Sequence, residues 1–206
     1  MQFPGDKILI FARAPVPGAC KTRLIPALGA VGAAALSERL LVRLLARLEE
    51  RPVAPVILCC TPDVDHPAFA RHQGERWRQE GADLGERMAN AARRALETGS
   101  RVLLIGTDCP LMESHYLSRA FEALDEVEVV IGPAEDGGYV LLGLRRFHPG
   151  LFRGIEWGSH RVLAQTLARI DALGWRHRRL ETLWDLDRPE DLQRLRMSSA
   201  TALLPK

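Results

Sequence analysis

The chain has 206 residues, of which 47% are hydrophobic and 26% are charged, a composition typical of one ordinary globular domain. Its net charge of +2, with no basic run interleaved with aromatics, argues against nucleic acid as a partner. The four cysteines lack metal-ligand spacing, and we find no signal-peptide pattern and no apolar segment of membrane-spanning length. We therefore expect a cytoplasmic protein without structural zinc or a membrane span.

The first half of the chain alternates apolar runs with helical patterns. Lys7–Ala12 predicts a buried strand, and a loop rich in proline and glycine follows it as far as Lys21. Leucines at helical spacing predict an amphipathic helix over Gly32–Glu50. Val56–Cys60 predicts a second buried strand, and Leu84–Glu97 predicts a helix.

The second half continues the alternation. It predicts strands over Val102–Ile105, Val127–Ile131, Tyr139–Leu144 and Trp175–Leu180, and helices over Ser114–Asp125, Ser159–Leu173 and Pro189–Met197. Strands that alternate with helices in this way favour a parallel sheet. The sequence therefore predicts a single α/β domain over residues 1–197, with a mostly parallel sheet and a C-terminal tail over residues 198–206.

The segment Gly106–Pro110 directly follows the apolar run Val102–Ile105. Asp108 is thereby placed at the carboxyl end of a buried strand, where open α/β sheets bind their ligands. A carboxylate in this position can hold a divalent metal against a phosphate. The structural alternative is that Asp108 caps a helix or stabilises a turn.

A basic loop lies between the first predicted strand and the first predicted helix. It contains Arg13, Gly18, Lys21 and Arg23, a set that suits a di- or triphosphate at a helix N-terminus. The P-loop pattern is not satisfied because Cys20 precedes the lysine, and the Rossmann glycine fingerprint is absent. A solvated basic loop without a ligand is the alternative.

More acidic residues come later in the chain. Asp187 can hold one Mg²⁺ jointly with Asp108, or it can cap the helix that begins at Pro189. Asp136 precedes two glycines, where it can bind a hydroxyl, activate a nucleophile or serve only as a turn residue. Asp83 has Glu86 three residues on, which is the pattern of a capping box.

Five motifs together resemble one superfamily over nearly all of residues 7–196. They are F-A-R-A-P-V-P-G-A-C-K-T-R-L (11–24), A-D-L-G-E-R-M (82–88), G-T-D-C-P (106–110), E-D-G-G-Y-V-L-L-G-L (135–144) and D-L-D-R-P-E-D-L (185–192). The chain resembles the GT-A-type nucleotide-diphospho-sugar transferases, and within them small bacterial transferases often described as glycosyltransferases. The stretch K-T-R-L is also similar to the 2-phospholactate guanylyltransferases.

The resemblance implies a GT-A fold, with helices on both faces of the sheet, and Mg²⁺ or Mn²⁺ as cofactor. It matches Asp108 and Asp187 to the metal positions, although Arg188 replaces the usual threonine. It implies nucleotide or phosphate contacts at Arg13, Gly18, Lys21, Arg23, Asp83 and Thr107, and acceptor or sugar contacts at Asp136, Gly137, Gly138 and Tyr139. Catalytic roles fall on Lys21, Asp108 and Asp136.

Two reactions share this set of residues. In nucleotidyl transfer, a phosphorylated small molecule attacks an NTP and pyrophosphate leaves. In glycosyl transfer, a nucleoside diphosphate leaves from a nucleotide sugar. The cations of the first loop favour nucleotidyl transfer, because a triphosphate carries more charge to neutralise. A non-catalytic module that binds a nucleotide is the third alternative, and the oligomeric state stays open.

Overall fold

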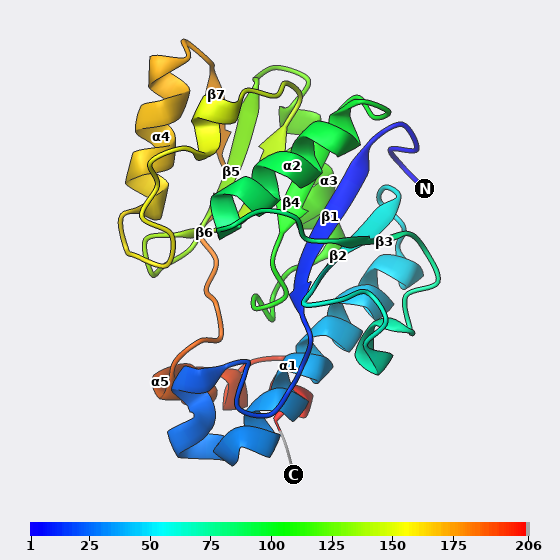
Figure 1. Cartoon of the computed structure of the whole chain (residues 1–206), viewed down its shortest axis with the longest axis vertical. Coiled ribbons are helices and arrows are strands. Elements are labelled where there is room, and N and C mark those ends of the chain that lie inside the picture. The colour runs from blue at the N-terminus through cyan, green and yellow to red at the C-terminus, as the bar shows by residue number, and fades with distance from the viewer. Residues whose placement is uncertain (205–206) are drawn as a thin grey trace.

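The computed structural model describes residues 1–204 and places seven strands in one sheet, in the order β3-β2-β1-β4-β6-β5-β7 (Figure 1). The strands are β1 (Lys7–Arg13), β2 (Val56–Thr61), β3 (Arg76–Arg78), β4 (Val102–Ile105), β5 (Val129–Pro133), β6 (Tyr139–Leu144) and β7 (His177–Arg179). The α-helices are α1 (Ile25–Glu50), α2 (Leu84–Leu96), α3 (Ser114–Ala123), α4 (Val162–Ala172) and α5 (Pro189–Arg196). Short 3₁₀ helices include η1 (Thr22–Leu24), η3 (Pro149–Phe152) and η4 (Thr201–Leu203).

The sheet is mostly parallel, as predicted. Only β6 runs antiparallel, between β4 and β5. The two central strands β1 and β4 pair in parallel with Ile10 opposite Ile105. The loops that follow these two strands therefore leave the sheet at the same edge, which brings the basic loop and the segment after β4 together.

Helices cover both faces of the sheet, and each face has its own apolar core. Leucines of α1 and residues of α3 such as Leu117 and Phe121 form one core with β1 and β4. Met88 and Ala92 of α2 and Ile170 of α4 form the other. The predicted α/β fold class is confirmed.

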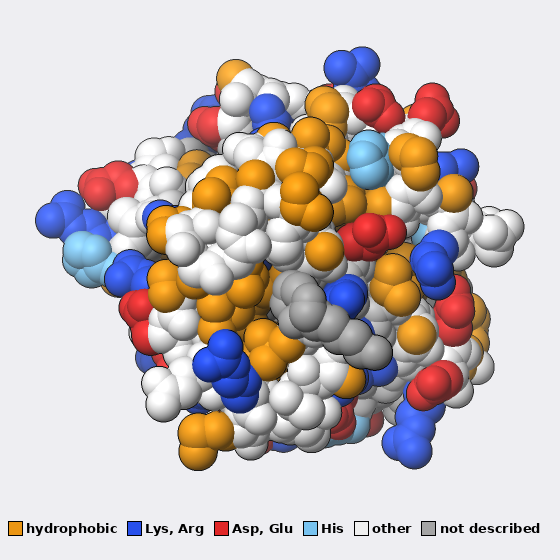
Figure 2. Space-filling view, turned by 90° about the horizontal axis from the view of Figure 1, so that it is seen from below, with side chains coloured by type: hydrophobic (Ala, Val, Ile, Leu, Met, Phe, Trp, Pro, Cys, Tyr) orange, Lys and Arg blue, Asp and Glu red, His pale blue; other side chains and the backbone are white. Residues whose placement is uncertain are grey.

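A third apolar cluster lies below the carboxyl edge of the sheet. It joins the first half of α1 to α5 and η4, and its members include Leu36, Leu192 and Leu203 (Figure 1). Figure 2 looks onto this layer from below, where hydrophobic side chains are exposed among charged ones. The layer forms a floor opposite the carboxyl ends of the strands.

Helix α1 begins earlier than predicted, at Ile25, and Gly29 interrupts it with a positive φ of 69°. By length and composition alone, the stretch Thr22–Glu50 is long and apolar enough to cross a membrane, so the prediction that no segment reaches that length is wrong. In this structure, leucines such as Leu40 and Leu44 are buried in the apolar cores of the domain. The apolar character of α1 thus serves packing against the sheet and the floor.

The short edge strand β3 is absent from the sequence-based prediction. Its sequence, Arg76-Trp77-Arg78, has no apolar run, and only Trp77 is buried. The Arg94 guanidinium lies 3.8 Å from the Trp77 ring centroid, and β3 pairs in parallel with β2. Because tertiary contacts hold this strand, the local pattern does not indicate it.

The tail predicted for residues 198–206 is packed against the domain as far as residue 204. Ala200 and Leu203 are buried in the third cluster, and Arg39 donates hydrogen bonds to the carbonyls of Leu203 and Leu204. Residues 205–206 lie outside the part of the chain that the structure describes.

A buried ion pair fastens the N-terminus to the sheet and to α3. The Arg101 guanidinium donates from Nε and Nη2 to Asp6 Oδ2, at 3.0 and 2.7 Å, and from Nη1 to the Phe121 carbonyl at 2.9 Å. Asp6 is only 3% exposed. Without Asp6, the Arg101 guanidinium keeps only the Phe121 carbonyl and the exposed Asp125 carboxylate as partners, and its Nε and Nη2 lose theirs.

We expect Asp6→Ala to lower the free energy of unfolding by about 3–5 kcal/mol, since breaking a buried pair costs this much. Urea unfolding followed by circular dichroism measures the change. The control is Arg119→Ala, which removes half of an exposed pair with Glu181 and should change the stability much less. A similar small loss for Asp6→Ala would contradict the structural role given to the pair.

Candidate active site

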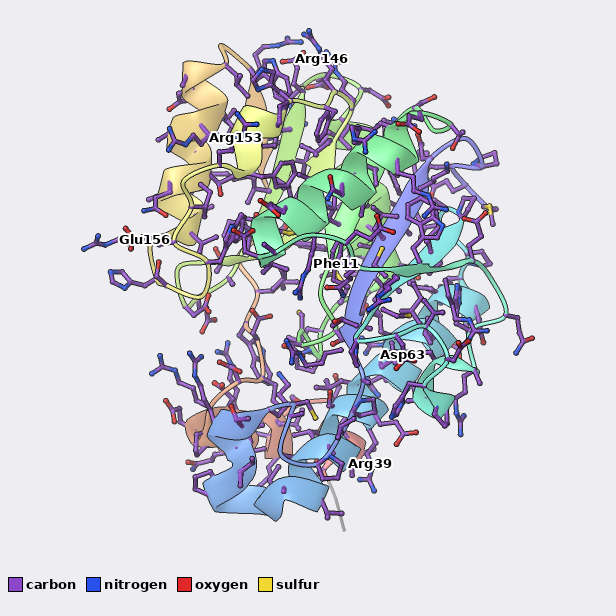
Figure 3. The ribbon with its side chains drawn as sticks, in the orientation of Figure 1. Phe11, Arg39, Asp63, Arg146, Arg153 and Glu156 are labelled. Atoms are coloured by element: carbon purple, nitrogen blue, oxygen red, sulfur yellow. The ribbon has the colours of Figure 1, made fainter. Side chains whose placement is uncertain are left out.

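A cavity of about 340 Å³ lies at the carboxyl ends of β1 and β4, and residues of the C-terminal segment before α5 also line it. Phe11, near the end of β1, contributes to its apolar wall (Figure 3). Its charged lining residues are Arg23, Asp108, Asp136, Asp185 and Asp187. The structure thus brings the three predicted acids Asp108, Asp136 and Asp187 into one cavity, together with a fourth, Asp185.

Lys21 joins the basic loop to the segment after β4. Its ammonium Nζ lies 2.9 Å from Asp108 Oδ1 and donates to the Leu186 carbonyl, and its side chain is only 4% exposed. Lys21 has a φ of 47°, the only left-handed conformation of a non-glycine residue within residues 1–204. Such a backbone costs about 1–3 kcal/mol and is often found at functional sites.

A second ion pair joins Arg23 to Asp187. Asp187 does not cap α5, so that alternative is wrong. The carboxylate of Asp191 accepts hydrogen bonds from the amides of Asp187 and Arg188, at 3.0 and 2.7 Å. The Asp187 side chain is therefore free to face the cavity.

Asp185 carries the most perturbed carboxyl group of the cavity. Its pKa is raised to about 7, chiefly by burial and further by the negative charges of Asp108 and Asp136, while the Lys21 ammonium opposes the shift. Asp185 lies near Asp187 in the sequence, but no local pattern indicates this environment. Only the folding of the C-terminal segment across the cavity brings these acids together.

The turn between β5 and β6 forms another part of the wall. Asp136 Oδ1 accepts a hydrogen bond from the Gly138 amide at 2.9 Å, and Gly138 and Tyr139 line the cavity. Gly137 does not, because a Cβ there would lie 2.2 Å from the His160 carbonyl oxygen. Its positive φ of 91° serves close packing within the chain. The ligand contact expected at Gly137 stays a prediction.

Trp157 is an aromatic residue of the wall that was not among the predicted site residues. Its ring meets Tyr139 edge-on, with centroids 6.5 Å apart. Gly85 makes room for it, since a Cβ there would lie 2.4 Å from Trp157 Nε1. No local signal marks a tryptophan as a cavity residue, because the contact joins elements far apart in the chain.

Five other predicted contact residues do not line the cavity. One of them is Lys21, which is connected to the cavity through its ion pair with Asp108. Arg13 is exposed, Gly18 lies in the basic loop with a φ of 82°, and Thr107 Oγ1 lies 3.3 Å from Asp108 Oδ1. Asp83 caps α2 by accepting from the Glu86 amide at 2.8 Å, and Glu86 accepts from the Ala82 amide at 2.8 Å. Their roles toward a nucleotide stay predictions.

The donor set suits a hard cation. Within residues 1–204, no three Asp, Glu, His or Cys side chains are close enough to hold a metal as they stand. Two of the acids are instead held by Lys21 and Arg23. Carboxylate oxygens are the ligands that Mg²⁺ prefers. Four carboxylates of the cavity face two cations, so negative charge is left over for an added cation.

Comparison with known proteins places the chain among transferases. Residues 44–159 match the family described as "uncharacterized protein conserved in bacteria (DUF2064)". The phosphoenolpyruvate guanylyltransferase of Rubrobacter xylanophilus is 34% identical over 202 residues, which cover 96% of this chain and 98% of the relative. The expected enzyme class, a transferase, and the suspected resemblance to guanylyltransferases are confirmed.

Solved structures agree with this placement. A protein from Desulfovibrio desulfuricans G20, provisionally assigned as a nucleotide-diphospho-sugar transferase, superimposes with a TM-score of 0.86 at 32% identity, covering 98% of this chain and 94% of its own. CMP:2-keto-3-deoxy-manno-octonic acid synthetase, solved with CTP, shares the fold with a TM-score of 0.61 at 12% identity, covering 96% and 99%. The chain therefore belongs to the DUF2064 family and has the fold of the nucleotide-diphospho-sugar transferases.

Proposed function

We propose that the protein is a Mg²⁺-dependent nucleotidyltransferase that uses an NTP and a phosphorylated small molecule. The observation that carries the proposal is the alternation of charge around one cavity. Asp108, Asp187 and Arg23 line it, Arg23 pairs with Asp187, and the buried Lys21 ammonium pairs with Asp108. The same cavity thus offers ligands for a cation and donors for phosphates. The guanylyltransferase relative makes GTP the first donor to test. Because NTPs are cytoplasmic substrates, we expect the protein to act in the cytoplasm.

In the proposed reaction, an oxygen of the acceptor phosphate attacks the α-phosphorus of the NTP. The bond between the α-phosphorus and the bridging oxygen breaks, and pyrophosphate leaves. Asp108 and Asp187, with Asp185 beside them, would hold Mg²⁺, which neutralises charge on the phosphate oxygens when bound. Lys21 and Arg23 would bind and orient the triphosphate. Positioning and electrostatics carry the reaction, so no covalent nucleophile is required.

The acceptor would lie along the wall formed by Asp136, Gly138 and Tyr139, all of which line the cavity. Asp136 is exposed, and its Oδ2 is free for an acceptor hydroxyl because Oδ1 holds the Gly138 amide. Tyr139 and Trp157, which also line the cavity, would shield this side of a bound acceptor from water. We expect the reacting phosphate to point toward Asp108 and the rest of the acceptor toward Asp136.

Glycosyl transfer is the second candidate, since the Desulfovibrio relative is assigned to the nucleotide-diphospho-sugar transferases. The test measures pyrophosphate release from each NTP with Mg²⁺ and phosphorylated acceptors, phosphoenolpyruvate first. A parallel assay measures nucleoside diphosphate release from nucleotide sugars. Acceptor-dependent pyrophosphate supports nucleotidyl transfer, whereas nucleoside diphosphate release alone supports glycosyl transfer. No metal-dependent binding of any nucleotide would contradict both.

A further inference from the structure

We propose that Lys21 and Arg23 are displaceable counter-ions, which hold the metal-binding acids in the ligand-free protein and transfer to phosphate when the metal enters. The divalent cation and the polyphosphate would then bind as one unit, and neither would bind well alone. The inference rests on the proposed function, because it assigns Asp108 and Asp187 to the metal. It goes beyond that function by giving the two cations a role before any ligand is bound.

Lys21 and a metal ion would compete for the Asp108 carboxylate. Lys21 Nζ lies 2.9 Å from Asp108 Oδ1, and it contacts the Leu186 carbonyl from the same position. A divalent cation bound to Asp108 would lie within a few ångströms of the ammonium. Two positive charges at this separation repel strongly in a partly buried site. The metal therefore requires Lys21 to leave Asp108.

Lys21 cannot leave without a new partner. Its side chain is 4% exposed, so an ammonium deprived of Asp108 stays buried without an anion. A buried unpaired charge is unfavourable, and phosphate oxygens of a nucleotide are the replacement that the reaction itself supplies. Metal binding to Asp108 and phosphate binding to Lys21 should thus favour each other.

Arg23 differs from Lys21 in its surroundings. Its side chain is 59% exposed, and Asp187 is 36% exposed, so water can solvate both groups once the pair separates. Exposed ion pairs contribute little. We therefore expect Lys21 to dominate the coupling and Arg23 to add a small part.

The decisive measurement is the binding of Mn²⁺ alone, without nucleotide, by isothermal titration calorimetry. Lys21→Met should bind Mn²⁺ at least about 10-fold more tightly than the wild-type protein, because Asp108 is then free. Arg23→Met should gain about 2- to 3-fold. Arg119→Met, which breaks an exposed pair outside the cavity, should bind as the wild type does. For GTP in EDTA, Lys21→Met should lower the affinity.

Two further variants separate competition from general charge effects and from misfolding. Lys21→Arg keeps the positive charge and should keep the binding of Mn²⁺ alone weak. The higher Mn²⁺ affinity of Lys21→Met should persist in 0.5 M KCl, where long-range electrostatic effects are screened beyond roughly 4 Å. Lys21→Gly suits the left-handed backbone and should bind Mn²⁺ as Lys21→Met does.

Equal Mn²⁺ affinity of the wild type and of both Lys21→Met and Lys21→Gly, with all three folded, would overturn the counter-ion role. The proposed function fails in a different way, namely if no NTP binds with or without metal. The metal-alone titration needs no nucleotide. Its outcome therefore decides the counter-ion role separately from the identity of the reaction.

Discussion

Asp108→Asn should lower kcat/KM for acceptor-dependent pyrophosphate release by about 10²–10³, which is the loss typical when one group that stabilises developing charge is removed. Asp108 lines the cavity and contacts Lys21, so it lies where the proposed metal and triphosphate meet. The amide keeps the shape of the carboxylate but removes its charge. The assay compares initial rates with GTP, Mg²⁺ and the acceptor found by screening.

Folding must be separated from chemistry in this variant, because the neutral amide leaves the Lys21 ammonium without its anion. Circular dichroism and a thermal unfolding curve should show a folded protein with a modestly lower Tm. The control Asp125→Asn neutralises an exposed aspartate that pairs with Arg101 outside the cavity, and it should keep full activity. Full activity in folded Asp108→Asn would contradict the assignment of Asp108.

The features that were predicted correctly from the sequence depend on local signals. β4 is four apolar residues, and all of them are buried, while Gly106 and Pro110 end the strand and fix where Asp108 emerges. The helices follow from leucine spacing and from caps such as Asp83. The parallel pairing of β1 with β4 then brings together the loops that follow these strands. A resemblance to a known fold is therefore enough to predict that Lys21 and Asp108 lie close together.

The features that were missed depend on contacts between distant segments. The pKa of Asp185 reflects burial where the segment before α5 meets Asp108 and Asp136, an environment that no pattern around residue 185 reveals. Gly137 has the residue type that admits a ligand, yet the segment at His160 fills the space beside it. Asp187 has the residue type that caps a helix, but Arg188 is the N-cap residue of α5, and the Asp191 carboxylate accepts from the amides of Asp187 and Arg188. In each case two roles suit one residue type, and only tertiary geometry selects between them.

Asp185→Asn should stabilise the metal-free protein at neutral pH. Burial raises the pKa of Asp185 from 3.8 to about 7. The folded protein therefore binds this proton more tightly than the unfolded chain does. Between these two pKa values, stability falls as the pH rises, and the loss is complete above pH 7, where it amounts to up to about 4 kcal/mol. Asparagine has no charge to bury and avoids this loss.

Urea unfolding in EDTA at about pH 4 and about pH 8 tests this expectation. The variant and the wild type should be nearly equal in stability at the acidic pH, and the variant should be more stable by a few kcal/mol at the basic pH. Added Mg²⁺ should raise the Tm of the wild type, because a cation compensates the crowded carboxylates, and should raise that of Asp185→Asn much less. A variant less stable than the wild type at both pH values would show that Asp185 holds the C-terminal segment in place. Equal gains at both pH values would show that packing, and not charge, is what the substitution changes. A carboxylate kept at a cost to the fold is expected where a cation must bind.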